Sequence, residues 1–179
     1  MTPALETARL LLRPLAVADA GQIQEIFPQW DVVRFLAATV PWPYPGDGAL
    51  SFCRDHALPA IERGDEWVWT IRLKAHPEGV IGLIHLMRGS DNNRGFWIGP
   101  RLQRLGLMTE ACDAVTTYWF KVLKFPLLRA PKAAANIASR RISEHQGMRL
   151  VATDERDYVS GRLATEVWEI TADEWNARR

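Results

Sequence analysis

The residues best suited to chemistry form a glycine-containing turn that leads directly into a helix-like segment. Residues 103–111 read Gln-Arg-Leu-Gly-Leu-Met-Thr-Glu-Ala, and a strand-like segment at residues 95–99 precedes them. Backbone N–H groups at a helix start have no intrahelical partner, and the helix dipole adds partial positive charge there, so this turn can bind a phosphate without a lysine. Gly106 lets the chain approach an anion closely. We therefore predict a phosphate site at this turn.

The elements that must hold the turn follow from hydrophobic spacing and turn residues. The pattern predicts strands at residues 10–15, 66–72, 79–87, 95–99, 127–130, 149–157 and 162–171, with a hairpin turn at 88–93. It predicts helices after a cap at Asp19, at residues 49–63 and 107–123, from Asn136 to Gly147, and after Thr171. Three prolines and two glycines make residues 40–48 a loop. This order predicts one three-layer α/β domain over residues 1–179, with a mixed, largely antiparallel sheet.

Composition narrows the function classes. The chain has 179 residues, 22 basic and 21 acidic, and a net charge of +1, so no general affinity for nucleic acid or an anionic membrane is expected. Cys53 and Cys112 lack the spacing of a metal site or a disulfide framework, and no metal is expected. No apolar run approaches the roughly 20 residues that span a bilayer. We expect a soluble, cytoplasmic protein.

The sequence of this turn is similar to a motif of a known protein family. Gln-x-x-Gly-x-Met followed by Thr-Glu-Ala resembles the acetyl-coenzyme A binding motif of the GNAT acetyltransferase superfamily. The segments at 5–10 and 95–98, and Asn136-x-x-Ser139 before Gly147, resemble its ribosomal-protein N-terminal acetyltransferase branch. Arg104 and Leu105 depart from the Gly and polar residue common at these positions. The resemblance implies a single-domain GNAT-like α/β fold whose sheet is splayed at its centre and flanked by helices on both faces.

The same resemblance implies acetyl-coenzyme A as the acyl donor and no metal. It implies that the pantetheine arm pairs with the strand at 95–99, that the thioester lies between this strand and residues 127–131, and that the Ile98 N–H stabilises the oxyanion. The residues it implies for coenzyme binding are Trp97, Ile98, Gln103, Arg104, Leu105, Gly106, Leu107, Met108, Thr109, Asn136 and Ser139.

Acyl transfer to an amine also needs proton transfers. The resemblance makes Ser139 the general acid for the departing thiolate, with water as the alternative; for Asn136 and Ser139, helix capping alone is the competing interpretation. Asp157 lies in a segment, 155–161, that resembles the acidic turn whose carboxylate takes the amine proton. The alternative for Asp157 is an ordinary solvated charge on a hairpin.

The acceptor side is the least determined by sequence. Trp42 and Tyr44 lie on the 40–48 loop, which covers the acceptor cleft in this fold, so they either contact the amine or form a hydrophobic clasp. His85 is interpreted as structural. We expect transfer of an acetyl group in a ternary complex to a primary amine, namely a protein or peptide N-terminus. The alternatives are a small amine acceptor and a non-catalytic acyl-coenzyme A binding domain. The family also makes a homodimer plausible.

Overall fold

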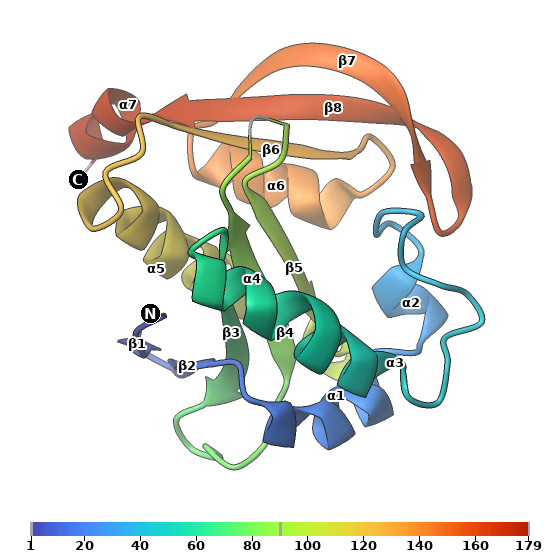
Figure 1. Cartoon of the computed structure of the whole chain (residues 1–179). Helices are drawn as coiled ribbons and strands as arrows, with labels where there is room; N and C mark the ends of the chain where they lie inside the picture. The colour runs from blue at the N-terminus through green and yellow to red at the C-terminus, as the bar shows by residue number, and fades with distance from the viewer. Residues whose placement is uncertain (1, 90, 179) are drawn as a thin grey trace.

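The computed structural model describes residues 2–89 and 91–178 (Figure 1). The strands are β1 (Leu5–Glu6), β2 (Leu10–Pro14), β3 (Glu66–Leu73), β4 (Gly82–Met87), β5 (Arg94–Ile98), β6 (Leu127–Ala133), β7 (Arg149–Tyr158) and β8 (Gly161–Thr171). The α-helices are α1 (Ala20–Ile26), α2 (Trp30–Val33), α3 (Gly48–Ser51), α4 (Leu58–Arg63), α5 (Leu107–Lys121), α6 (Ile137–His145) and α7 (Ala172–Ala177). None of the described helices has the length and apolar character needed to cross a membrane.

The strands form two sheets. One has the order β1-β2-β3-β4-β5 and the other the order β6-β8-β7, and every pair within them is antiparallel. The predicted splay therefore lies between β5 and β6, which belong to different sheets. The predicted hairpin turn lies between β4 and β5, although residue 90 falls outside the described residues.

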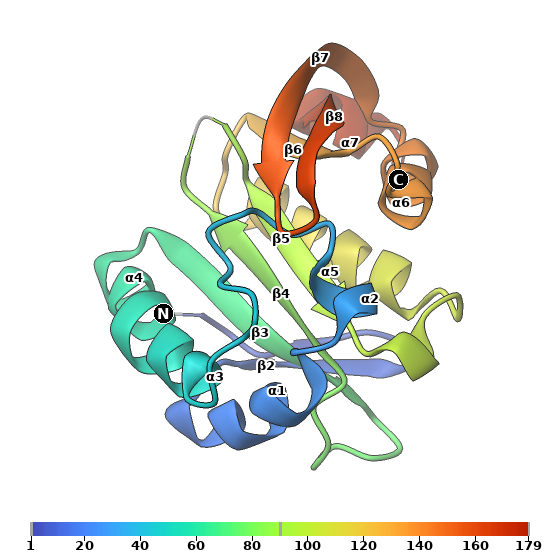
Figure 2. The same ribbon diagram turned by 90° about the vertical axis from the view of Figure 1, so that its right-hand side faces the viewer.

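Helices cover both faces of the five-stranded sheet, as expected (Figures 1 and 2). Side chains alternate along a strand, so the side chains of neighbouring residues of β3 point to opposite faces of the sheet. Trp69 packs in the cluster that contains α5, whereas Val68 packs in the cluster that contains α1 and the start of the α3–α4 segment. Both side chains are fully buried. The sheet is thus fixed from two sides, which holds its last strand, β5, in place.

A single buried side chain joins the two sheets where they meet. Asn93 directly precedes β5, and its backbone N–H donates to the Arg129 carbonyl of β6 at 2.7 Å. The Asn93 Oδ1 accepts the Arg129 N–H at 2.7 Å. This side-chain oxygen takes the place of the backbone carbonyl that would accept the second hydrogen bond in a regular strand pair. Its Nδ2 donates to the carbonyl oxygens of Met87 and Gly89 at 3.2 and 2.6 Å. Asn93 therefore fixes the vertex from which β5 and β6 diverge.

The predicted helix at 49–63 contains an irregularity. Residues 52–57 form π-helical turns between α3 and α4, directly before Leu58 and Pro59. Proline lacks an N–H and its ring clashes with the preceding turn, and a π-type turn accommodates both effects. Gly64 closes this helix with φ +76°, as predicted.

Other boundaries also follow local chemistry. Gly147 has φ +69°, and Thr171 and Glu174 form the expected capping box before α7. Asp19 does not act as the predicted side-chain cap of α1. Its carboxylate accepts the Ala16 N–H at 2.9 Å and pairs with buried Arg72 at 2.6 Å. The short helix α2 was not predicted, because four residues are too few to show a helical period.

Replacing Asn93 by alanine is expected to destabilise the fold. The substitution leaves the partly buried Arg129 N–H and two carbonyl groups without this partner, and leaving a buried group unsatisfied costs about 1–3 kcal/mol. We expect the free energy of unfolding in urea to fall by at least about 2 kcal/mol. The control is Asn176→Ala, on the exposed face of α7, which should change it by no more than about 0.5 kcal/mol. Equal effects of the two substitutions would contradict the role of Asn93 at the vertex.

Candidate functional site

The predicted phosphate turn connects β5 to α5. A short 3-10 turn at Pro100–Leu102 follows β5, and residues 103–106 are exposed before α5 begins at Leu107. Arg104 and Gly106 have positive φ angles, +64° and +75°. Gly106 adopts this left-handed conformation without strain and directs the chain into the helix. The arrangement gives the free N–H groups of the first turn of α5 an open approach, as an anion site requires.

Residues from the start of the chain brace this turn. Glu110, in the first turn of α5, accepts hydrogen bonds from the Thr7 hydroxyl and from the Arg9 N–H at 2.8 Å. The Arg9 guanidinium pairs with Glu110 at 2.8 Å and donates to the Leu105 carbonyl at 3.0 Å. Burial acts to raise the pKa of Glu110, but the bonds from Thr7 and Arg9 outweigh it and leave the pKa lowered. The segments at 5–10 and 103–111 therefore form one unit.

The edge of β5 that faces β6 is open beyond Asn93. The Gly99 N–H donates toward β4, to the Ile81 carbonyl at 2.9 Å. Because N–H groups alternate along a strand, the Ile98 N–H points the other way, toward the open edge. The Gln103 side chain reaches the Ile98 carbonyl at 3.4 Å. Trp97, which was also expected to bind the coenzyme, differs from Ile98. By the same alternation its backbone N–H points toward β4, and its side chain lines a cavity.

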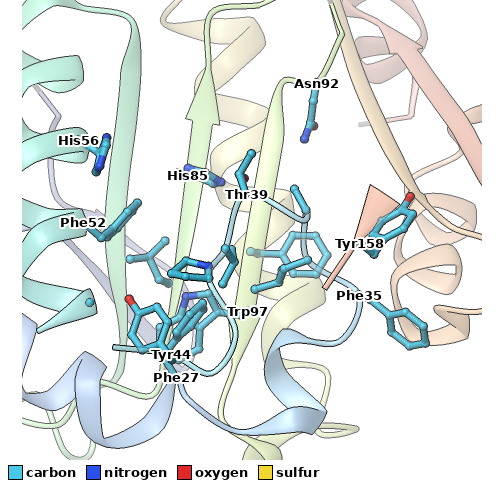
Figure 3. A pocket seen from close by; sticks show the side chains of 18 of the residues that line it. Phe27, Phe35, Thr39, Tyr44, Phe52, His56, His85, Asn92, Trp97 and Tyr158 are labelled. Carbon is cyan, nitrogen blue, oxygen red and sulfur yellow. The ribbon is translucent and has the colours of Figure 1, made fainter. Parts of the chain in front are cut away.

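That cavity has a volume of about 670 Å³ and lies across the splay. Figure 3 shows aromatic side chains around it, with Tyr44, Phe27 and Trp97 grouped on one side and Tyr158 across from them. The rings of Tyr44 and Phe27 lie 4.8 Å apart, centre to centre. Residues from β5, β6 and α6 also line it, so one space extends from the diverging strands to the aromatic group.

A two-segment strap borders the cavity. The loop after α2 meets the tip of the β7–β8 hairpin (Figure 2). Ala37 pairs with Tyr158, and the Ala38 N–H donates to the Asp157 carbonyl at 3.2 Å. The Val159 N–H donates to the Leu36 carbonyl at 3.0 Å. The strap is therefore held through the backbone.

Asn136 and Ser139 both line the cavity at the start of α6. The Asn136 side chain accepts the Ser139 N–H at 3.3 Å, so Asn136 caps the helix. The hydroxyl of Ser139 makes no hydrogen bond to another described residue, and this side chain is buried. Capping thus accounts for Asn136 but leaves the hydroxyl of Ser139 available.

Asp157 lies at the rim of the cavity, on β7. Its side chain is 66% exposed and its Oδ1 lies 3.2 Å from Nη1 of Arg162. Asp157 therefore lies at the edge of the cavity, and its exposure is what the alternative interpretation, an ordinary solvated charge, expects.

The two aromatic residues of the 40–48 loop lie in different environments. Tyr44 lines the cavity, and burial, followed by the charge of Cys53, raises its pKa to about 12. Trp42 is not among the cavity-lining residues; it packs against Trp30 on the surface, with ring centres 5.8 Å apart. Packing one ring against another buries part of both aromatic faces, which holds Trp42 away from the cleft.

Some lining residues were not assigned to a site from the sequence, and one of them, His85, was interpreted as structural. His85 of β4 lines the cavity, and its Nδ1 lies 3.8 Å from Glu66. Arg94 and Lys132 line it although both are almost fully buried. Both lie just outside the strands predicted at 95–99 and 127–130, and the sequence contains no signal of the cavity. Among the described residues, no group of three or more His, Cys, Asp or Glu side chains could hold a metal ion.

Comparison with protein-family models decides the family. The model described as an acetyltransferase (GNAT) domain matches residues 9–149. The chain belongs to the GNAT acetyltransferase family. It is therefore an acyl-coenzyme A dependent N-acetyltransferase with acetyl-coenzyme A as its donor, as the turn motif implied. A search of curated proteins finds no match.

Solved structures show that this GNAT chain has the fold of known acetyltransferases. A ribosomal L7/L12 α-N-protein acetyltransferase, RimL, in complex with coenzyme A is 12% identical, with 96% of this chain and 99% of that chain covered and a TM-score of 0.81. The ribosomal-protein-S5-alanine acetyltransferase from Vibrio fischeri is 13% identical, with 97% and 98% covered and a TM-score of 0.80. The microcin C7 self-immunity acetyltransferase MccE, in complex with acetyl-CoA and AMP, is 14% identical, with 92% and 93% covered and a TM-score of 0.77.

Replacing Gly106 by valine tests the phosphate turn of this GNAT enzyme. A Cβ at Gly106 would lie 3.5 Å from Arg9, an ordinary contact, but the φ of +75° costs a branched residue about 1–3 kcal/mol. The side chain also stands where the phosphate must approach. We expect calorimetry to show acetyl-coenzyme A binding weakened at least ~10-fold. Gly21→Val, at an exposed position of α1 with no atom within 4 Å, is the control. Equal affinity of the two variants would show that the coenzyme does not use this turn.

Proposed function

We propose that this enzyme acetylates the N-terminal α-amino group of a protein or peptide by direct transfer in a ternary complex. The observation that carries the proposal is the single cavity that joins the diverging strands to the strap. Ser139 lines it on the coenzyme side and Asp157 at the rim, so donor and acceptor can occupy one space.

The charge of the cavity favours an acceptor with one amine. Among the described residues only two carboxylates, Asp47 and Asp157, line the cavity, and the cation Arg156 also lines it. A polyamine or an aminoglycoside carries several positive charges and would gain little from this wall. A peptide N-terminus brings one charge, and the aromatic residues offer its first side chain an apolar surface.

The proposed chemistry needs three groups. Asp157 takes a proton from the ammonium group, directly or through water, and the neutral nitrogen attacks the thioester carbonyl carbon. The Ile98 N–H, fixed in β5, donates to the oxyanion without reorganising. The carbon–sulfur bond then breaks, and the thiolate takes a proton from the Ser139 hydroxyl. The nitrogen, which became positively charged on attack, gives its second proton through water to the Ser139 alkoxide. In the coenzyme site, the turn at 103–109 binds the pyrophosphate and the open edge of β5 binds the pantetheine arm.

A small amine is the second candidate acceptor. It is favoured by the likeness to MccE, a self-immunity acetyltransferase whose structure contains acetyl-CoA and AMP. The likenesses to RimL and the S5-alanine acetyltransferase favour a protein acceptor. A homodimer and a cytoplasmic location stay predictions.

The deciding experiment measures release of free thiol from acetyl-coenzyme A with peptides of varied first residue beside small amines. Acetylation of peptides that is lost when their N-terminus is blocked supports the proposal. Turnover confined to small amines would replace it with the second candidate.

Asp157→Asn is expected to lower kcat/KM for the amine roughly 100-fold, the scale of general-base catalysis, with little change in acetyl-coenzyme A affinity. Glu155→Gln is the matched control, because Glu155 lies two residues away and also pairs with Arg162, at 3.6 Å, without lining the cavity. Equal kinetics of the two variants would remove Asp157 from the mechanism.

Ser139→Ala separates catalysis from helix capping. Alanine keeps the backbone N–H that Asn136 accepts, so the cap of α6 is retained. We expect kcat to fall by at least about 10-fold while the thermal unfolding midpoint stays within a few degrees. An unchanged kcat would assign the thiolate proton to water.

A further inference from the structure

Two cations lie buried beside the vertex where β5 and β6 diverge. Arg94 of β5 is 3% exposed and Lys132 of β6 is 6% exposed, yet both line the cavity. Nη1 of Arg94 donates to the Thr116 hydroxyl at 2.8 Å and to the Gln146 amide oxygen at 2.7 Å. These bonds hold the guanidinium without neutralising it.

Lys132 is held in the same way by α6. Its Nζ donates to the Ser143 hydroxyl and lies 3.4 Å from the carbonyl oxygen of Ser139. No described carboxylate forms an ion pair with Lys132 or Arg94, and Nε of Arg94 is buried without a hydrogen-bond partner. Buried charges without an opposite charge are costly, and an incoming anion would offset part of that cost.

The charged groups around Lys132 come from three elements. The pKa of Lys132 is lowered to about 7, first by burial and then by the charge of Arg94 on β5, while Cys112 on α5 and Glu166 on β8 act in the opposite direction. Glu166 is itself paired with Arg140 at 2.8 Å. The positive charge of this wall is therefore only partly balanced.

The position of the pair identifies which part of a substrate reaches it. Arg94 directly follows Asn93 at the vertex, and it alternates with Phe96 and Ile98, so all three face α5. A coenzyme whose pyrophosphate lies at the start of α5 and whose arm follows β5 from Ile98 points its acyl group toward the vertex. The acyl group, which lies beyond the sulfur, is thus directed at Arg94 and Lys132.

We infer that this enzyme accepts acyl-coenzyme A donors whose acyl chain ends in a carboxylate, with Arg94 and Lys132 binding that carboxylate. The inference rests on the proposed course of the coenzyme along β5. The transfer is the same: the amine nitrogen bonds to the thioester carbonyl carbon, the carbon–sulfur bond breaks, and the thiolate is protonated as the nitrogen loses a proton. The distal carboxylate is unchanged and appears in the amide product.

The carboxylate belongs to the donor rather than to the acceptor because of the side on which the cations lie. Arg94 bonds to α5 and Lys132 to α6, on the coenzyme side of the splay. Tyr44 and His56, which border the acceptor side, come from the opposite layer. An acidic acceptor would have to pass the thioester to reach the pair.

The first test measures binding without any acceptor, so it does not depend on the acceptor's identity. Succinyl-coenzyme A and butyryl-coenzyme A have acyl chains of equal carbon number and differ in the terminal charge. At pH 7 we expect calorimetry to show succinyl-coenzyme A binding at least ~10-fold more tightly than butyryl-coenzyme A. Equal or weaker binding would overturn the inference while leaving acetyl transfer intact. Absence of acetyl-coenzyme A binding would refute the coenzyme site itself, and the inference with it.

The second test removes one cation with little change of length. Lys132→Met should reduce the succinyl-to-butyryl affinity ratio at least ~10-fold. Lys121→Met, at an exposed position of α5, is the control for net charge and should leave that ratio unchanged. An equal loss for acetyl, butyryl and succinyl donors would overturn the inference and make Lys132 a general support of the site.

A third measurement reads the charge state of Lys132 directly. A nearby carboxylate favours the ammonium form and raises the pKa of Lys132 above about 7. At pH 8, binding of succinyl-coenzyme A should therefore take up a proton, measured as a difference in heat between phosphate and Tris buffers. Acetyl-coenzyme A should show less uptake, and Lys132→Met should abolish the difference. Equal uptake with both donors would contradict a carboxylate at Lys132.

Discussion

The architecture depends on the bond pair between Asn93 and Arg129. At this point a side-chain amide oxygen does what a backbone carbonyl does in a regular sheet, and the two sheets are held together without being merged. If backbone pairing continued along β5 and β6, the two strands would close the open edge. Because the pairing stops at one residue, the N–H groups on that edge of β5 remain for a ligand. A buried, fully bonded asparagine is thus compatible with an open sheet beside it.

The second constraint is the bracing of the turn that is predicted to bind the coenzyme. The 5–10 segment is far from residue 110 in sequence, but Thr7 and Arg9 both bond to Glu110. This brace orients the first turn of α5 against the edge of the sheet, with Arg9 also fixing the carbonyl of Leu105. The geometry of the glycine turn is therefore fixed by contacts with the 5–10 segment as well as by its own φ angles.

Sequence reasoning succeeded where local chemistry decides the outcome. The αL glycines at 64 and 147, the cap at Asn136 and the helix from Leu107 each follow from a few neighbouring residues, and the motif at 103–111 led to the family. It failed where tertiary contacts choose between options. Asp19 occupies a capping position, but its carboxylate forms an ion pair with Arg72 instead of capping the helix. Trp42 and Tyr44 lie on the same loop, but Tyr44 packs against Phe27 and faces the cavity, whereas Trp42 packs against Trp30 on the surface. Sequence reasoning did not single out Arg94 and Lys132, because a cavity is not encoded in any one segment.

The strap formed by residues 36–38 and the hairpin tip has an evolutionary consequence. Its contacts are made by main-chain atoms of Leu36, Ala38, Asp157 and Val159, which are present with any side chain at these positions except proline. Mutation can therefore change the chemical character of the entrance while the wall itself stays in place. New acceptors become accessible by drift at a handful of loop positions, with the donor half of the enzyme unaffected.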